Sequence, residues 1–225
     1  MENFDYISKN LDELLSEISK MRSVVTLVAV TKSGSDEELL ALCRAGIADV
    51  GENRPQELSR RGRLMKEAGF SPRLHEIGNL QRNKVKMIID EVALIHSLDS
   101  YSLALEINKQ AERVGRRVPV LIEINSAGEE SKGGIMPNEA EEFFLKVREL
   151  PAIAVSGLMT MGPVVDNPEE MRPYFKLAKK IFDSLKEKYG FEGEGILSMG
   201  MSDSYAVAIE EGATLVRVGR RLFKS

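Results

Sequence analysis

The sequence has little of several residue types that would mark a particular class of protein. Among its 225 residues it has one cysteine, two histidines and no tryptophan. The single cysteine, Cys43, excludes a framework of disulfide bonds and is typical of a reducing, cytoplasmic setting. Because Cys43, His75 and His96 lack the compact spacing of zinc ligands, we expect no metal site.

The chain also lacks an excess of positive charge and any long apolar stretch. Its 31 Lys and Arg residues against 35 Asp and Glu residues give a net charge of -4, the wrong sign for attraction to nucleic acid or an anionic membrane surface. No stretch reaches the roughly 18 apolar residues of a membrane span. The start of the chain alternates charged and apolar residues, unlike a secretory signal. We therefore expect neither nucleic acid nor a membrane as a partner.

What the sequence does contain is a regular alternation of two patterns. Short apolar, β-branched runs predict strands buried on both faces, and apolar residues at spacings of three and four between them predict helices. An amphipathic helix over residues 3–21 precedes the first strand, and Ser35 with Glu38 forms a capping box for the next helix, through Ala45. The predicted strands are 24–30, 47–50, 74–77, 93–95, 118–124, 153–158, 196–199 and 214–218. The later helices cover about 55–68, 80–90, 100–114, 138–149, 168–189 and 203–211.

Eight strands that alternate with helices predict a closed (β/α)₈ TIM barrel with an extra N-terminal helix. Single-domain α/β barrels commonly have about 200 to 250 residues, and the chain has no linker or break in composition. We therefore predict one domain over residues 1–225. The alternative, a doubly wound open sheet, normally has fewer strands.

Lys32 is the candidate for chemistry because it directly follows the first predicted strand. In a barrel of this kind the active residues lie at the carboxyl ends of the strands. A lysine at a strand end commonly extends into solvent. Partial desolvation at the barrel mouth, however, would favour a neutral and nucleophilic amine. Such an amine forms Schiff bases with aldehydes and ketones.

The last two predicted strands are followed by residues typical of a phosphate site. Ser202 lies just after the seventh strand, and Gly219 with Arg220 follows the eighth. Loops seven and eight form the usual phosphate site of this fold, where hydroxyl and backbone N–H groups hold the oxygens. Each residue taken alone is explained as a helix cap or a strand end. Together with a reactive lysine they predict a phosphorylated aldehyde: pyridoxal 5′-phosphate, or a sugar phosphate in an aldolase.

Arg217, in the last predicted strand, bears on that choice. Alternation directs its side chain away from the face of Val216 and Val218, which would place it in the barrel interior. There it would face the pyridine nitrogen of pyridoxal phosphate, which an always protonated guanidinium would leave unprotonated. The alternative is an ion pair with an acidic residue in the barrel floor.

Several motifs carry a resemblance to a known family. They are VAVTK ending at Lys32, GEN at 51–53, HEIGNLQRNK at 75–84, SKGGI at 131–135, GLMTMGP at 157–163, LSMGMS at 197–202 and AIEEGATLVRVG at 208–219. The chain resembles the pyridoxal phosphate homeostasis protein family over nearly its whole length. The resemblance implies a barrel like the N-terminal domain of bacterial alanine racemase, with pyridoxal 5′-phosphate held on a lysine as an internal aldimine. It also implies a role in intracellular vitamin B6 and amino-acid homeostasis without robust turnover.

The resemblance also implies which residues form the site. Lys32 matches the aldimine lysine, Arg217 the arginine at the pyridine nitrogen, Ser202 and Gly219 the phosphate ligands, and Asn53, His75 and Met199 positions that line or border the pocket. Where the family usually has threonine after the last glycine, this chain has Arg220. Its backbone N–H can still donate, and its side chain either contacts the phosphate or points to solvent. Arg54 and Pro55 replace an aromatic and a small apolar residue that are common in the family.

Two rival functions would use the same lysine. An amino-acid racemase needs a second acid/base residue, which alanine racemase, by resemblance, takes from the partner subunit of a two-domain dimer. We expect this chain to be a monomer without that domain. A Schiff-base aldolase would need an inward carboxylate or proton-relay partner for Lys32, and the sequence assigns none. The expected partners are pyridoxal phosphate and pyridoxal-phosphate-dependent apoenzymes.

Two other features are interpreted as structural. The basic cluster Arg60, Arg61 and Arg63 is typical of a solvated helix face, and Cys43 lies inside an amphipathic helix, where it is expected in the core.

Overall fold

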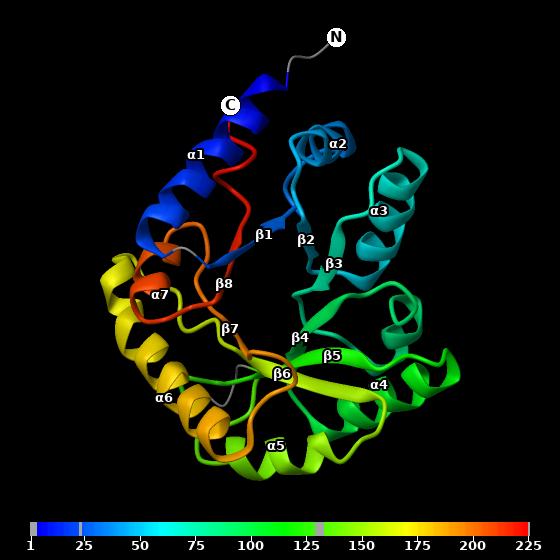
Figure 1. Cartoon of the computed structure of the whole chain (residues 1–225), viewed down its shortest axis with the longest axis vertical. Helices are drawn as coiled ribbons and strands as arrows, with labels where there is room; N and C mark the ends of the chain where they lie inside the picture. The colour runs from blue at the N-terminus through cyan, green and yellow to red at the C-terminus, as the bar shows by residue number, and fades with distance from the viewer. Residues whose placement is uncertain (1–3, 23, 129–132, 225) are drawn as a thin grey trace.

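Eight parallel strands form a closed barrel in the computed structural model of the chain, which describes residues 4–22, 24–128 and 133–224. Each strand pairs with its neighbours in sequence, and the last closes the barrel on the first (Figure 1). The strands are β1 (Thr26–Val30), β2 (Asp49–Glu52), β3 (Arg73–Glu76), β4 (Leu94–Leu98), β5 (Val118–Glu123), β6 (Ile153–Met159), β7 (Ile196–Ser198) and β8 (Leu215–Val218). The prediction of a (β/α)₈ barrel is therefore confirmed.

Helices surround the barrel in the order that the sequence predicts. They are α1 (Asp5–Met21), α2 (Asp36–Arg44), α3 (Pro55–Glu67), α4 (Tyr101–Arg113), α5 (Ala140–Arg148), α6 (Arg172–Tyr189) and α7 (Tyr205–Glu210), with 3₁₀ helices η1 (Arg82–Met87) and η2 (Pro168–Met171). The capping box of Ser35 and Glu38 at the start of α2 is present. None of these described helices is long and apolar enough to cross a membrane.

The prediction of an α-helix over 80–90 is wrong, because that segment forms the 3₁₀ helix η1. Val85 and Ile88, three residues apart, are both buried there. A turn of three residues brings both side chains to one face, so the short connection between β3 and β4 covers the barrel without a full α-helix. Strand boundaries also shift: β1 begins at Thr26, after the exposed Val24, and β2 covers residues 49–52 instead of 47–50. Strand β4 extends to Leu98 instead of ending at residue 95, and the other strands differ by one residue at one or both ends.

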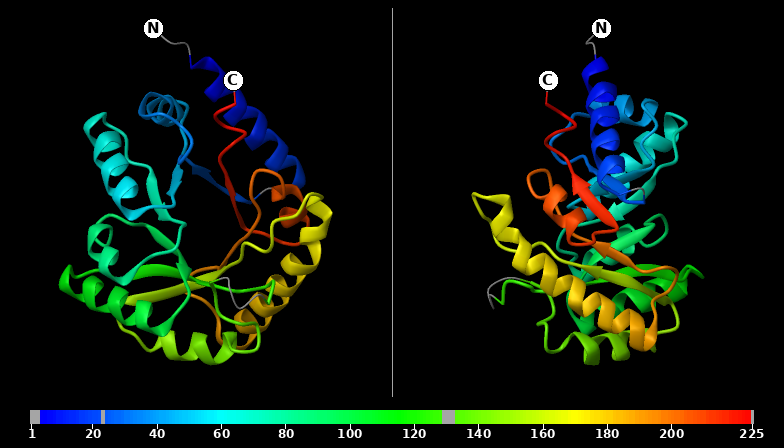
Figure 2. Two further views of the ribbon diagram at one scale, coloured as in Figure 1. Left: turned by 180° about the vertical axis from the view of Figure 1, so that it is seen from behind. Right: turned by 60° about the vertical axis from the view of Figure 1, so that its left-hand side comes forward.

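The extra N-terminal helix completes the outer ring. Helix α1 packs against α2 on one side and α7 on the other. The segment after β8 runs along α1 (Figure 2), where Arg221 pairs with Glu17 and Asn10 donates to the Leu222 carbonyl at 3.2 Å. Helix α1 therefore occupies the place of the helix that would follow the eighth strand.

The barrel wall separates two apolar layers. Outward-facing strand residues join the helices in one large core, and a second buried cluster lies inside: Val28, Leu94, Leu121, Met159 and Leu215. Side chains alternate across each strand, so the next inward positions along β4 and β8 are His96 and Arg217, which are both buried. The barrel interior is therefore apolar in one part and polar in the other.

Candidate functional site

Lys32 lies in the turn that follows β1, and its side chain is exposed. The turn is closed by the Gly34 N–H, which donates to the Thr31 carbonyl at 3.0 Å. The desolvation that the sequence suggested for Lys32 is not found, because β1 ends at Val30 and Lys32 lies in an exposed part of the turn that follows. The amine is therefore accessible at the carboxyl end of the barrel.

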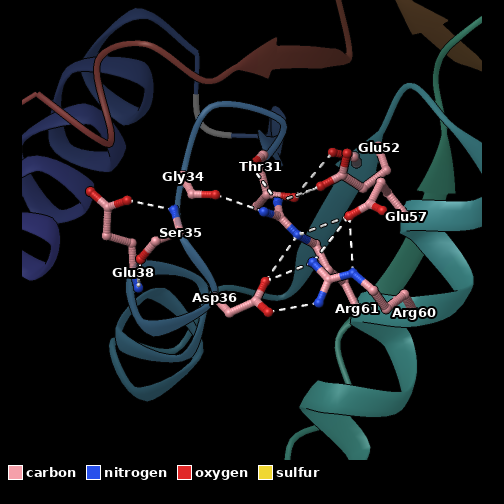
Figure 3. A network of polar contacts seen from close by, with 10 residues as sticks. Thr31, Gly34, Ser35, Asp36, Glu38, Glu52, Glu57, Arg60 and Arg61 are labelled. Atoms are coloured by element: carbon pink, nitrogen blue, oxygen red, sulfur yellow. Dashed lines mark hydrogen bonds and ion pairs between the residues drawn. The ribbon is translucent and has the colours of Figure 1, made fainter.

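Arg61 of α3 holds the backbone of this turn from outside the barrel (Figure 3). Its Nη1 donates to the Thr31 carbonyl at 2.5 Å and its Nη2 donates to the Gly34 carbonyl at 2.6 Å. These two carbonyls lie on either side of Lys32 in the chain. The expectation of a solvated basic cluster is wrong for Arg61, which is 7% exposed. Its helix lies against the β1 turn, so a long side chain there reaches buried acceptors.

Glu52 compensates the buried charge of Arg61. Its Oε1 accepts from Arg61 Nη1 at 2.7 Å and from the Thr31 hydroxyl at 2.5 Å. Glu76, on the neighbouring strand, accepts from the Gly78 N–H at 3.1 Å through Oε1, while Oε2 is buried without a hydrogen-bond partner among the described residues. Burial, together with the charge of Glu52, raises the pKa of Glu76 to about 8.

Ser202 and Gly219 meet where the loops after β7 and β8 come together. The Gly219 N–H donates to the Ser202 hydroxyl at 3.3 Å. A Cβ atom at Gly219 would lie 2.7 Å from the Val30 carbonyl oxygen, so only glycine fits without a shift of backbone. Arg220 is exposed and pairs with Asp203 at the surface, which corresponds to the solvent-facing alternative for its side chain.

Arg217 points into the barrel, as the alternation of β8 predicts, and is 3% exposed. Its Nη1 donates to the Ser198 hydroxyl at 2.5 Å and its Nη2 donates to the Thr160 carbonyl at 3.1 Å. Burial lowers the pKa of Arg217 to about 10, so the guanidinium remains charged at neutral pH. Burial also raises the pKa of Glu123 to about 7, with the charge of Asp99 adding to the effect and that of Arg217 opposing it.

The side chains of two predicted site residues do not lie at the carboxyl end of the barrel. His75 is buried inside the barrel, where its ring nitrogens contact Asp49 at 2.8 Å and His96 at 2.9 Å. Met199 is fully buried in the large core. Both side chains are therefore enclosed by protein and do not line the carboxyl edge of the barrel.

Asn53 follows β2 at the carboxyl edge and is half-buried. Its carbonyl oxygen lies so close to Gly78 that a Cβ atom there would be 2.1 Å away. Two loops therefore touch through their backbones at this point, and the glycine of the HEIGN motif fixes the position of Asn53.

Strand pairing brings the main candidates together. Strands β1 and β8 are neighbours, with Val28 opposite Arg217 and Ala29 opposite Val218. Lys32, Arg217 and the Gly219–Ser202 pair therefore lie at adjoining strand ends. Two surface hollows, beside Lys179 on α6 and beside Phe70 before β3, contain none of the predicted site residues. No group of three potential metal ligands occurs among the residues that the structure describes.

Four polar residues around these candidates received no role in the site from the sequence: Glu52 and His96, although they lie at the ends of predicted strands, Ser198, and Arg61, which was expected in a solvated cluster. The signal for Ser198 and His96 was present, since each lies at an inward position of its strand. The signal for Arg61 was weak, because a charged residue on an amphipathic helix is ordinarily exposed.

Comparison with known proteins places the chain in a family. Residues 3–225 match the model of the alanine racemase N-terminal domain. A pyridoxal phosphate homeostasis protein of Aquifex aeolicus (strain VF5) is 39% identical over 99% of this chain and 96% of its own length. The protein of the same name from Helicobacter pylori (strain ATCC 700392 / 26695) is 37% identical over 98% of this chain and 99% of its own length.

Solved structures agree with that placement. PipY of Synechococcus elongatus, in a structure with PLP bound, superposes with a TM-score of 0.84 at 27% identity over 97% of this chain and 100% of its own. An alanine racemase of Clostridium difficile 630 has a TM-score of 0.76 at 19% identity, and this chain covers 56% of its length, which shows the fold alone. Because the identity to these curated relatives extends over nearly the whole of both chains, this chain belongs to the pyridoxal phosphate homeostasis protein family, and its barrel is an alanine racemase N-terminal domain.

Proposed function

We propose that this chain binds pyridoxal 5′-phosphate at the carboxyl end of its barrel and serves vitamin B6 and amino-acid homeostasis in the cytoplasm. The names of its relatives and the PLP-bound structure of PipY support the ligand and the role. Transfer of the cofactor to pyridoxal-phosphate-dependent apoenzymes by a monomer is part of the same proposal.

The phosphate end of the cofactor fits the Gly219–Ser202 pair. The missing Cβ atom of Gly219 lets the loop after β8 pack against the Val30 backbone, which brings the Gly219 N–H beside the half-buried Ser202 hydroxyl. Backbone N–H and hydroxyl donors arranged in this way bind phosphate oxygens. Arg220 would add its backbone N–H, since its side chain is engaged with Asp203.

The ring and the aldehyde fit the two cationic residues. Arg217 remains charged and has a fixed direction, so it can face the pyridine nitrogen and disfavour its protonation. When bound, the cofactor supplies an aldehyde that an amine can attack. Lys32 supplies that amine, because its side chain is exposed while its backbone is held by Arg61. Asn53 would border the ligand from the neighbouring loop.

The observation that carries this proposal is the pairing of β1 with β8, which places the lysine turn beside Arg217 and the phosphate loops. Titration of the purified protein with pyridoxal phosphate, followed by visible absorbance, tests it. We expect saturable binding that Ser202→Ala weakens about tenfold, the loss of one hydrogen bond to a charged group. Ser184→Ala, a half-buried serine of α6, is the matched control. Absence of saturable binding, or equal effects of both variants, would contradict the assignment.

A second assay separates this function from that of a racemase. Incubation of the loaded protein with L-alanine should give no racemisation at ordinary enzyme rates. Rapid turnover that Lys32→Ala abolishes would replace homeostasis with catalysis as the function.

A further inference from the structure

Five buried polar side chains form one continuous hydrogen-bonded chain through the barrel interior. Asp49 Oδ1 contacts His75 Nε2 at 2.8 Å, and His75 Nδ1 contacts His96 Nε2 at 2.9 Å. His96 Nδ1 contacts the Ser198 hydroxyl at 3.0 Å, and Ser198 accepts from Arg217 at 2.5 Å. The five residues come from β2, β3, β4, β7 and β8, and each is less than 8% exposed.

The Asp49 end of this chain, with one proton on each histidine ring, sets the direction of the hydrogen bonds in it. Burial opposes ionisation of Asp49, but hydrogen bonds from His75 and Arg73 outweigh it and hold the pKa of the carboxyl below its ordinary value. The Asp49 carboxylate can therefore only accept, so His75 must carry a proton on Nε2. With one proton on each ring, His75 Nδ1 accepts from His96 Nε2, and His96 Nδ1 accepts from the Ser198 hydroxyl.

Arg73 and burial set the surroundings of the two rings. The Asp49 charge is already compensated by Arg73, which donates to both carboxylate oxygens at 2.6 Å. Burial, with the charge of Arg217 adding to the effect, holds the pKa of His96 well below its ordinary value.

The direction of these hydrogen bonds determines which part of the Ser198 hydroxyl faces Arg217. Because the Ser198 proton is donated to His96, a lone pair of Ser198 Oγ faces Arg217 Nη1. We propose that His75, His96 and Ser198 are positioning residues that hold the Arg217 guanidinium in the direction from which it meets a bound ligand ring. The proposal rests on the proposed function for the identity of that ring, whereas the direction of the chain does not depend on it.

Nuclear magnetic resonance of the histidine rings tests the direction, because the protein has only these two histidines. In protein labelled with ¹⁵N-histidine, four ring nitrogens are observed, and two-bond nitrogen–proton correlations identify which carries the proton. At pH 7 we expect both rings to carry their proton on Nε2, with or without pyridoxal phosphate. A proton on Nδ1 of either ring would overturn the assigned direction.

Two variants connect the direction to its cause. Asp49→Asn provides an amide in place of an obligatory acceptor, so we expect the Nδ1–H form of His75 to become populated. Retention of pure Nε2–H rings in that variant would show that Asp49 does not set the direction. Ser198→Ala deletes the donor to His96 Nδ1, and the shift of that nitrogen identifies the His96 signals. Ser97→Ala is the control, because Ser97 lies on the same strand as His96 and its buried hydroxyl has no hydrogen-bond partner among the described residues. It should leave the protonation of both rings unchanged.

Ligand binding then tests the positioning role. We expect Ser198→Ala to weaken pyridoxal phosphate binding about tenfold, which corresponds to about 1.4 kcal/mol, and to shift the absorption maximum of the bound cofactor. Ser156→Ala, a buried serine of β6 that donates only to the Ala154 carbonyl in the described structure, is the control. Equal affinity and spectra in both variants would overturn the positioning role. Failure of the wild-type protein to bind pyridoxal phosphate, with the ring protonation as expected, would instead contradict the proposed function.

Discussion

The two cationic residues of the candidate site are held in opposite ways. Lys32 is fixed through its backbone, because Arg61 binds the carbonyls of Thr31 and Gly34 on either side of it and leaves its side chain exposed. Arg217 is fixed through its side chain, which is buried and bonded to Ser198 and Thr160.

The difference follows from what each group is required to do. An amine that forms a covalent bond needs freedom to approach and leave a carbonyl carbon. A guanidinium that acts by charge is most effective when its direction is fixed in advance, so that binding does not have to order it. The support of Lys32 lies outside the barrel, between β1, β2 and α3, and the support of Arg217 lies inside it.

The largest expected effect is that of removing the outer support. Arg61→Met would leave Glu52 buried without its partner, and breaking a buried ion pair costs about 3–5 kcal/mol. We expect a loss of that order in the free energy of unfolding, measured with urea, and slower covalent attachment of pyridoxal phosphate to Lys32. Arg60→Met is the matched control, because Arg60 lies on the same helix and forms half-buried ion pairs with Asp36 and Glu57, whose loss should cost about 1 kcal/mol. Equal costs would mean that Arg61 does not support the turn.

A pH-dependent effect is expected on the same side of the barrel. The folded-state pKa of Glu76, about 8, exceeds its ordinary value of 4.5. Between these values the unfolded chain releases a proton that the folded protein keeps, so the free energy of unfolding falls as pH rises. Glu76→Gln removes this loss and keeps the acceptor for the Gly78 N–H.

The variant should therefore gain stability relative to the wild type as pH rises from about 5 to 8, by at most about 1.4 kcal/mol per pH unit. Urea unfolding at several pH values measures the difference. Parallel pH profiles of the two proteins would show that Glu76 ionises normally.

The smallest effect is expected at the rim. Arg220→Ala removes an exposed ion pair with Asp203, and such pairs contribute about 1 kcal/mol or less. Because only its backbone N–H is proposed to face the phosphate, affinity for pyridoxal phosphate should change less than threefold, measured by the same absorbance titration. A tenfold loss would place the guanidinium on the ligand.

The sequence was sufficient to predict the barrel and the positions of residues at its carboxyl edge. It was not sufficient to predict the residues that support them. Apolar runs and glycines mark strand ends, so Lys32, Ser202 and Gly219 could be located by their distance from a strand. The role of His75 could not be predicted from the sequence, because its partners Asp49 and His96 lie 26 and 21 positions away and contact it only in the closed barrel. Arg61 was misread for a related reason: its acceptors are backbone carbonyls about 30 residues earlier, which leave no trace in the pattern of side chains.

The central claim is that Lys32 is the residue to which the cofactor attaches. Its most direct test is borohydride reduction of the protein mixed with pyridoxal phosphate, followed by peptide mapping, with Lys32→Ala and the exposed-lysine variant Lys146→Ala in parallel. We predict a stable pyridoxyl group on the peptide that contains Lys32 in the wild type and in Lys146→Ala, and none in Lys32→Ala. A label distributed over surface lysines, or one that persists in Lys32→Ala, would contradict the account.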